Sequence, residues 1–171
     1  EGIDLLLEAV RHIVEDRGRE DIQFCLVGGG PSLASLQALC SEMGLDDYVT
    51  FAGRAPDETL FAVLATCDVC VNPDRVNPMN DLSTMNKILE YMAFGRPIVQ
   101  FDVKEGRFSA QEASLYARPN DAVDFAEKVL ELLGDEDQRA RRGAFGRRRV
   151  TEALSWEHQV PTLIAAYQRC A

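Results

Sequence analysis

The alternation of short apolar runs with amphipathic helical segments is the feature that most constrains how this chain folds. The first run, Ile22–Val27, is continuous and ends at a cluster of glycines, as expected of a strand buried on both faces of a parallel sheet. Further strands are expected at Tyr48–Phe51, Val69–Val71, Pro97–Phe101 and Ser114–Ala117. Because helical segments lie between them with short connections, right-handed β-α-β units should form. The sequence therefore predicts an α/β fold, a Rossmann-like parallel sheet with helices on both faces.

Apolar residues at helical spacing place the helices around these strands. The opening helix should end near Gly18, and the third helix should begin after Asp57 as its N-cap. The polar stretch Asp102–Glu112 is expected to be a loop. The remaining helices are expected at 31–43, 81–94, 121–133, 136–152 and 155–169. Since the last three follow the final strand, a helical C-terminal segment should complete the domain.

The length of 171 residues is that of one domain with a single core, so residues 1–171 are interpreted as one unit. No strand pattern precedes the opening helix, although the helix that opens a β-α-β domain usually follows a strand. We therefore expect the chain to be a fragment that lacks its first strand.

The charge balance excludes several classes of partner. Lys and Arg number 18 and Asp and Glu number 28, which gives a net charge of −10. A chain this acidic is not expected to bind nucleic acid or to present a broadly basic face to a membrane. No apolar run approaches the roughly 18–20 residues that a spanning helix needs.

The five cysteines are odd in number and irregular in spacing, which favours a reducing, cytosolic compartment. Cys67 and Cys70 match a C-x-x-C pattern, but they fall at the end of a helical segment and the start of a strand. A redox pair usually opens a helix, and the second C-x-x-C of a zinc site is absent. The sequence favours core cysteines, with a redox or metal site as the weaker alternative.

Four loops should gather at one edge of the predicted sheet, because the carboxyl ends of parallel strands lie together. They are Gly28–Pro31, Gly53–Pro56, Pro73–Asn80 and Asp102–Phe108. Open α/β sheets bind their ligands at this edge. The glycines of the first loop let the backbone approach a ligand, but they match neither G-x-G-x-x-G nor a P-loop, and a tight turn explains them equally well.

The helix expected at 81–94 begins at the same edge, where its free N–H groups and its dipole favour an anion. Its polar stripe holds residues at i, i+3, i+4 and i+7, namely Ser83, Asn86, Lys87 and Glu90. Lys87 could add a positive charge for a phosphate, and Glu90 could accept hydrogen bonds from sugar hydroxyls. The alternative is a solvated helix face with a Lys87–Glu90 pair worth a few tenths of a kcal/mol.

Five segments, in this order and at these spacings, resemble the C-terminal half of the family-four retaining glycosyltransferases. They are GIDLLLEA at 2–9, LVGGGP at 26–31, VTFAGR at 49–54, CDVCVNP at 67–73 and KILEYMAFGRPIV at 87–99. The resemblance implies the GT-B fold, two Rossmann-like domains with the active site in the cleft between them. This chain would be the donor-binding half. The acceptor domain, and the family's basic residues that grip the diphosphate, would lie outside it.

The resemblance also implies roles for individual residues, with a nucleoside-diphosphate sugar as donor and no metal or other cofactor. The segment 51–55 would hold the nucleobase, and Glu90 the ribose. Lys87 is assigned a catalytic role at the diphosphate. Asp81 is assigned the second catalytic role, because Leu82 stands where the E-x7-E motif has its first glutamate. The further donor-binding residues would be Gly28, Gly29, Gly30, Gly53, Arg54, Ser83, Thr84, Met85 and Asn86.

The implied function is transfer of a sugar from the donor to a glycan or lipid-linked acceptor, with retention, in cell-surface polysaccharide or glycoconjugate synthesis. The enzyme would be cytoplasmic or peripheral at the inner membrane face, and the isolated fragment would be inactive. Half of a sugar-nucleotide 2-epimerase, and a non-catalytic nucleotide-binding or scaffold domain, remain alternatives. The basic run Arg139–Arg149 is interpreted as a solvated helix face, with contact to lipid headgroups or another domain as the alternative.

Overall fold

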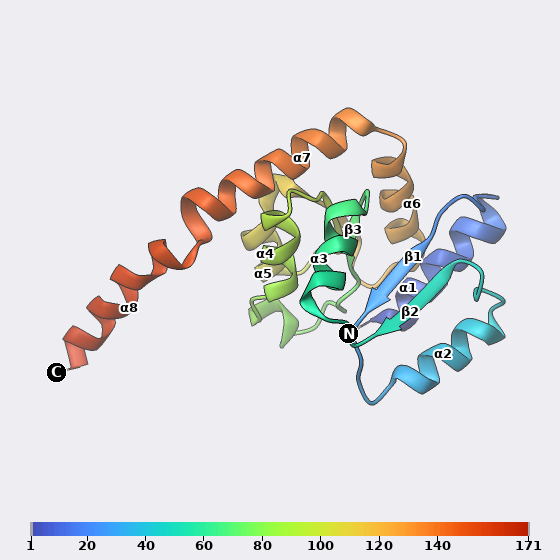
Figure 1. Ribbon diagram of the computed structural model, residues 1–171, viewed down its shortest axis with the longest axis horizontal. Coiled ribbons are helices and arrows are strands. Elements are labelled where there is room, and N and C mark those ends of the chain that lie inside the picture. The colour runs from blue at the N-terminus through green and yellow to red at the C-terminus, as the bar shows by residue number, and fades with distance from the viewer. Residues whose placement is uncertain (1, 171) are drawn as a thin grey trace.

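The computed structural model describes residues 2–170 and has alternating strands and helices in its first two thirds (Figure 1). The strands are β1 (Phe24–Val27), β2 (Val49–Gly53), β3 (Cys70–Asn72), β4 (Ile98–Phe101) and β5 (Ser114–Ala117). The α-helices are α1 (Ile3–Arg11), α2 (Leu33–Glu42), α3 (Asp57–Thr66), α4 (Asn86–Ala93), α5 (Lys104–Ala110), α6 (Ala122–Leu133), α7 (Glu136–Arg149) and α8 (Trp156–Cys170). Four short turns of other helical type complete the order: η1 (His12–Asp16), η2 (Asn80–Leu82), η3 (Gln111–Ala113) and η4 (Val150–Leu154).

All strand pairs are parallel, and helices cover both faces, so the predicted fold class is confirmed. The strands form two sheets rather than one. In the first sheet Phe24 of β1 is level with Val49 of β2. In the second sheet Ile98 of β4 lies between Cys70 of β3 and Ser114 of β5.

The helices bury two apolar clusters. The larger cluster joins α1, α2 and α6 to strands of both sheets, and Leu6, Leu7 and Phe125 are fully buried in it. The smaller cluster joins α3, α4 and α7 to β3 and β4 around Ile88 and Met92. Because the larger cluster reaches both sheets, α1 and α6 hold the two sheets in one body.

The segment predicted as the first strand does form a strand, β1, but most of it is not buried as predicted. Phe24 is buried, but Cys25 is exposed and Leu26 and Val27 are half-buried. The reason is topological, since β1 pairs with β2 on one side and faces a cavity on the other. The prediction that this strand is buried on both faces therefore fails.

Three boundaries differ from the sequence predictions. The helix expected from Asp81 begins at Asn86, after the η2 turn and an extended stretch, 83–85. The expected loop 102–112 contains α5. Pro56, not Asp57, is the N-cap of α3, and no side chain caps that helix. The first difference matters most for the site, because it removes Ser83 from the helix.

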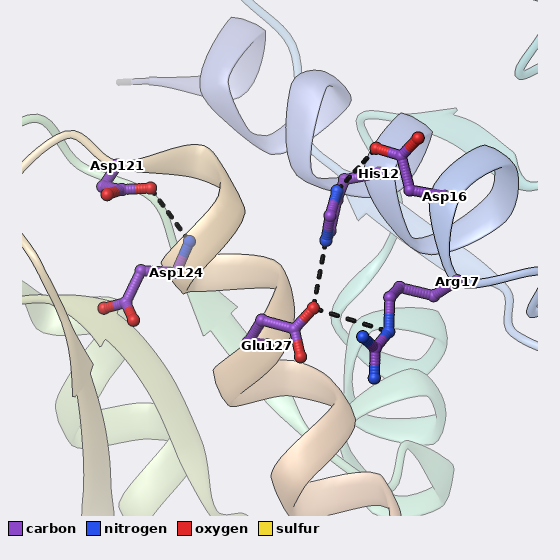
Figure 2. A network of polar contacts seen from close by, with 6 residues as sticks. All are labelled: His12, Asp16, Arg17, Asp121, Asp124 and Glu127. Carbon is purple, nitrogen blue, oxygen red and sulfur yellow. Dashed lines mark hydrogen bonds and ion pairs between the residues drawn. The ribbon is translucent and has the colours of Figure 1, made fainter.

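A polar cluster links the η1 turn to α6. Figure 2 shows the His12 ring between two carboxylates, with Nδ1 2.7 Å from Asp16 and Nε2 3.0 Å from Glu127. Arg17 lies 3.5 Å from the same Glu127 oxygen. The hydrogen bond to Glu127 raises the pKa of His12 above its usual value, and Asp16 adds to the effect. This cluster therefore favours the charged form of the imidazole.

Three arginines of α7 bind backbone carbonyls of the elements beside it. Arg139 donates to Leu132 O and Leu133 O at the end of α6, at 2.8 and 2.7 Å. Arg142 donates to the carbonyls of residues 112 and 114 beside β5, and Arg149 to those of 108 and 109 in α5. The interpretation of this run as a solvated face is therefore wrong for these three side chains.

The C-terminal helix α8 extends away from the rest of the chain (Figure 1). Its large apolar side chains are exposed, namely Trp156, Leu163, Ile164 and Tyr167. No helix within residues 2–170 combines the length and the apolar character that crossing a bilayer requires.

Candidate functional site

A cavity of about 1480 Å³ lies between the two sheets, and one end of it reaches the carboxyl ends of their strands. Its lining includes the glycine loop after β1 and two side chains of α4. We call this end of the cavity the mouth and define it by Gly28, Gly29, Gly30, Lys87 and Glu90. All five are among the residues that the sequence assigned to donor binding or catalysis, so the structure brings this group together.

The loops after β1 and β2 meet beside the mouth. Gly28 N donates to Gly53 O at 2.7 Å, and both glycines have positive φ, 137° and 64°. A Cβ at Gly29 would lie 3.6 Å from Arg54 Cγ, in ordinary contact. The predicted donor-binding residues of these two loops therefore form one surface, whose turns depend on backbone conformations that glycine adopts without strain.

Lys87 lies on the first turn of α4 and forms an ion pair inside the mouth. Its Nζ is 3.0 Å from Oδ2 of Asp74. The Asp74 side chain is 4% exposed and the Lys87 side chain 29% exposed. A carboxylate this buried requires a cation, so Lys87 has a structural partner in addition to any ligand.

Asp74 is the site residue that sequence reasoning missed. The only signal for Asp74 in the sequence is its position, directly after Asn72-Pro73 at the carboxyl end of a predicted strand. Glu90, by contrast, lies one turn after Lys87 on α4, is exposed, and lines the mouth as predicted.

A second group of predicted residues lies at the start of α5, outside the described lining of the cavity. Asp81 Oδ1 accepts a hydrogen bond from Lys104 N at 3.0 Å, and Asp81 Oδ2 is 3.6 Å from Lys104 Nζ. Thr84 donates to Glu105 at 2.9 Å. Asp81 therefore holds the η2 turn against α5, and its carboxylate is engaged in that contact.

The remaining predicted residues have local roles in this structure. Ser83 Oγ donates to Met79 O at 2.7 Å. Met85 packs against the smaller core and is the N-cap residue of α4. Asn86 is the first residue of α4 and is exposed. The Leu82 side chain is 84% exposed, because residue 82 ends the η2 turn and lies outside α4.

The C-x-x-C pair lines the cavity away from the mouth. Cys67 Sγ and Cys70 Sγ are 3.5 Å apart, and both are free thiols. The hydrogen bond with Cys70, helped by the charge of Arg96, lowers the pKa of Cys67 to about 7. The same hydrogen bond, followed by burial, raises the pKa of Cys70. Among residues 2–170, no group of three or more potential ligands could hold a metal ion.

Comparison with known proteins gives consistent matches over most of the chain. The sequence profile described as "Glycosyl transferases group 1" matches residues 1–135. A GDP-mannose-dependent alpha-(1-6)-phosphatidylinositol monomannoside mannosyltransferase of Mycobacterium tuberculosis is 32% identical over 161 residues, covering 91% of this chain and 41% of the relative. A 2-deoxystreptamine glucosyltransferase of Streptomyces kanamyceticus is 27% identical over 165 residues, covering 94% of this chain and 41% of the relative.

A solved structure, sucrose-phosphate synthase from Thermosynechococcus elongatus, superposes with a TM-score of 0.82 at 28% identity, covering 99% of this chain and 42% of that one. The chain thus spans about two fifths of the length of these relatives. The profile match covers well over half of the chain, and the resemblance seen in the sequence is confirmed. This chain belongs to the group 1 glycosyl transferases.

Proposed function

We propose that this chain is the donor-binding half of an enzyme that moves a sugar from a nucleoside diphosphate to an acceptor. The observation that carries the proposal is the mouth, where the glycine loop after β1 lines the same cavity as Lys87 and Glu90. Parallel α/β sheets bind nucleotides at this position. A cation one turn before a carboxylate suits a diphosphate joined to a ribose.

The chemistry of the two side chains supports this assignment. The Lys87 ammonium can stabilise negative charge on the leaving diphosphate, and preorganised charge of this kind is usually the largest catalytic contribution. The Glu90 carboxylate can accept hydrogen bonds from two ribose hydroxyls. We propose that these groups hold the donor without a metal. The role proposed for Asp81 becomes that of a positioning residue, because its carboxylate binds the start of α5.

The finer features of the reaction are proposals of the same kind. The relative of 32% identity is GDP-mannose-dependent, which supports a nucleotide sugar as donor. We propose a glycan or lipid-linked acceptor, held by a second domain, and retention of the anomeric configuration. We also propose a role in cell-surface glycan synthesis, at a cytoplasmic or peripheral inner-membrane location.

The test is a thermal-shift panel on the 171-residue chain with millimolar UDP, GDP, ADP, CMP and NAD. A ligand at 100 times its dissociation constant adds about 2.7 kcal/mol of stability, which moves the melting temperature visibly. We expect one nucleoside diphosphate to raise it, and Glu90→Gln to abolish the shift. The matched control is Glu42→Gln, at the far end of α2, which should keep the full shift.

The outcomes separate the alternatives. A shift with NAD alone would contradict a glycosyltransferase donor site. A shift that survives Glu90→Gln would place the nucleotide elsewhere than the mouth. A chain that no nucleoside diphosphate stabilises would refute binding by these residues.

A further inference from the structure

The thiols of Cys67 and Cys70 are nearly in contact, although they belong to different elements. Cys67 is the C-cap residue of α3, and Cys70 is the first residue of β3. Their sulfur atoms are 3.5 Å apart. Because an S–S bond is about 2.05 Å long, the sulfurs need to approach each other by only about 1.5 Å to form one. The fold therefore holds the two thiols close to bonding distance.

The two thiols differ in how readily a reagent reaches them. Both line the cavity, but Cys67 is half-buried whereas Cys70 is only 6% exposed. The cavity of about 1480 Å³ is larger than the roughly 300–1,000 Å³ of most small-molecule sites. A small reagent in the cavity therefore reacts first with Cys67, and Cys70 is placed to react with the product.

The end of α3 carries a cation that helps Cys67 to ionise. A thiolate at a helix C-terminus is normally disfavoured, because the carbonyl groups there are partially negative. Here the Arg96 guanidinium donates to Cys67 O at 3.0 Å and also to Ala65 O. The hydrogen bond from Cys70 is the main cause that lowers the pKa of Cys67 to about 7; the charge of Arg96 adds to it, and burial and Asp68 oppose it. Cys67 is therefore partly a thiolate near neutral pH, which is the form that attacks disulfides.

The reaction of Cys67 makes the proton of Cys70 easier to lose. The hydrogen bond with Cys67 is the main cause that raises the pKa of Cys70, followed by burial and the negative charge of Cys67. A Cys67 sulfur in a mixed disulfide carries no charge and is a weaker hydrogen-bond acceptor. The first reaction thus removes one of these causes and weakens another, which prepares Cys70 for a second attack.

We propose that Cys67 and Cys70 form a reversible dithiol–disulfide site that exchanges with low-molecular-weight disulfides. The Cys67 thiolate attacks one sulfur of the small disulfide, whose S–S bond breaks, and the released thiolate takes up a proton. Cys70 then loses its proton to solvent and attacks Cys67 Sγ, which breaks the mixed S–S bond and releases the second small thiolate to be protonated. Two protein thiols are oxidised to one disulfide, and one small disulfide is reduced to two thiols. The proposal concerns the two thiols and stands whether or not the mouth binds a nucleotide.

The experiment treats the 171-residue chain at pH 7 with mixtures of oxidised and reduced glutathione. Acid stops the exchange, and N-ethylmaleimide blocks the thiols that remain. Trypsin then releases both cysteines of the pair in one peptide, 55–75, because no Lys or Arg lies between Arg54 and Arg75. Cys25 and Cys40 fall together in another peptide, 20–54. Mass spectrometry distinguishes free thiols, bound glutathione and an internal disulfide in each peptide.

We expect peptide 55–75 to lose two hydrogens, to take up no blocking reagent, and to regain both thiols with dithiothreitol. In the variant Cys70→Ser the second attack is absent, so glutathione should stay bound at Cys67. The fraction of chains with glutathione on this peptide should be at least about tenfold lower in the unchanged chain, because a neighbouring thiol acts at a high effective concentration.

Two controls accompany this comparison, and circular dichroism checks that each variant is folded. Within peptide 20–54, the exposed Cys25 should retain glutathione and the buried Cys40 should stay free. The variant Cys67→Ser tests the order of attack independently of Cys70→Ser. In that variant the buried Cys70 should remain a free thiol.

Three results would overturn the proposal. Free thiols throughout peptide 55–75, while Cys25 carries glutathione, would show that the pair does not react with a small disulfide. Glutathione retained on this peptide of the unchanged chain, to the same extent as in Cys70→Ser, would show that the two sulfurs do not bond. Glutathione on Cys70 in the variant Cys67→Ser would contradict the assignment of Cys67 as the attacking thiol.

Discussion

Replacing Lys87 by methionine removes a cation from beside an almost fully buried carboxylate. Asp74 would keep its charge with 4% of its side chain exposed, and methionine would replace only the apolar stem of the lysine. We therefore expect Lys87→Met to destabilise the fold, in addition to any effect on ligand binding.

The magnitude follows from the geometry of the pair. At 3.0 Å and an effective dielectric constant of about 20, the Coulomb attraction is about 5.5 kcal/mol. Desolvation of both groups offsets part of this, and removing one partner of a buried pair typically costs about 3–5 kcal/mol. Because Lys87 is 29% exposed, we expect a loss of about 3 kcal/mol in the free energy of unfolding.

A double-mutant cycle isolates the pair from the other contacts of Lys87. Asp74→Asn removes the buried charge and keeps nearly the same side-chain shape. The double variant should therefore lose about 2 kcal/mol less unfolding free energy than the two single variants lose in sum. Urea denaturation followed by circular dichroism measures all four proteins. A coupling energy below about 0.5 kcal/mol, the usual error of additivity, would refute the argument that Asp74 requires Lys87.

Three further predictions concern stability and reactivity. Gly143→Ala places a Cβ 2.0 Å from Gly95 O, so α7 must move, and urea denaturation should show a net loss of about 2 kcal/mol. Stability should include a contribution from the His12–Glu127 contact that is fully present below the unfolded-state pKa of His12. Since the folded-state pKa is raised, this contribution is lost as the pH rises through it, which urea titrations between pH 5 and 8 would show. Alkylation of Cys67 by iodoacetamide, followed by mass spectrometry, should accelerate with a midpoint near pH 7.

Each of these predictions has a matched control. Gly30→Ala adds a Cβ with no atom within 4 Å and should be nearly neutral, so an equal loss there would contradict the packing argument. His12→Gln should flatten the difference in stability between pH 5 and 8. Cys70→Ser should raise the pH midpoint of Cys67 alkylation, because it removes the Cys70 thiol whose hydrogen bond lowers the pKa of Cys67. Cys40, buried elsewhere in the larger core, should stay slow at every pH tested.

The sequence predicts the bounds of a helix or strand well where they depend on neighbouring residues. It fails where a contact with a residue far along the chain sets the boundary. β5 is predicted at 114–117 and lies there, and the helix predicted at 121–133 is α6, Ala122–Leu133. The predicted start of α4 at Asp81 is wrong because the Asp81 carboxylate binds the N-terminus of α5 instead of opening a helix. That contact is 23 residues away in the chain, so no local pattern could reveal it.

In the candidate site, too, some features could be predicted from the sequence and others could not. The grouping of the glycine loop with Lys87 and Glu90 followed from strand order, because all strand-to-helix loops of a parallel sheet share an edge. The burial of Asp74, and the use of Lys87 as its partner, depend on how tightly the loop after β3 packs. A charged residue in a predicted loop gives no sign of that packing.

The guanidinium contacts of α7 have a consequence for how the domain responds to its solvent. Their acceptors are carbonyl groups, which carry no net charge, so dissolved ions screen these bonds far less than they screen exposed pairs such as Arg19–Asp21. Arginine also keeps its proton throughout the physiological range. The attachment of α7 to α5, β5 and α6 should therefore hold from low ionic strength to molar salt, although the chain as a whole carries a charge of −10. A cell that concentrates or dilutes its electrolytes would alter the surface pairs of this domain and leave the anchoring of its long helix unchanged.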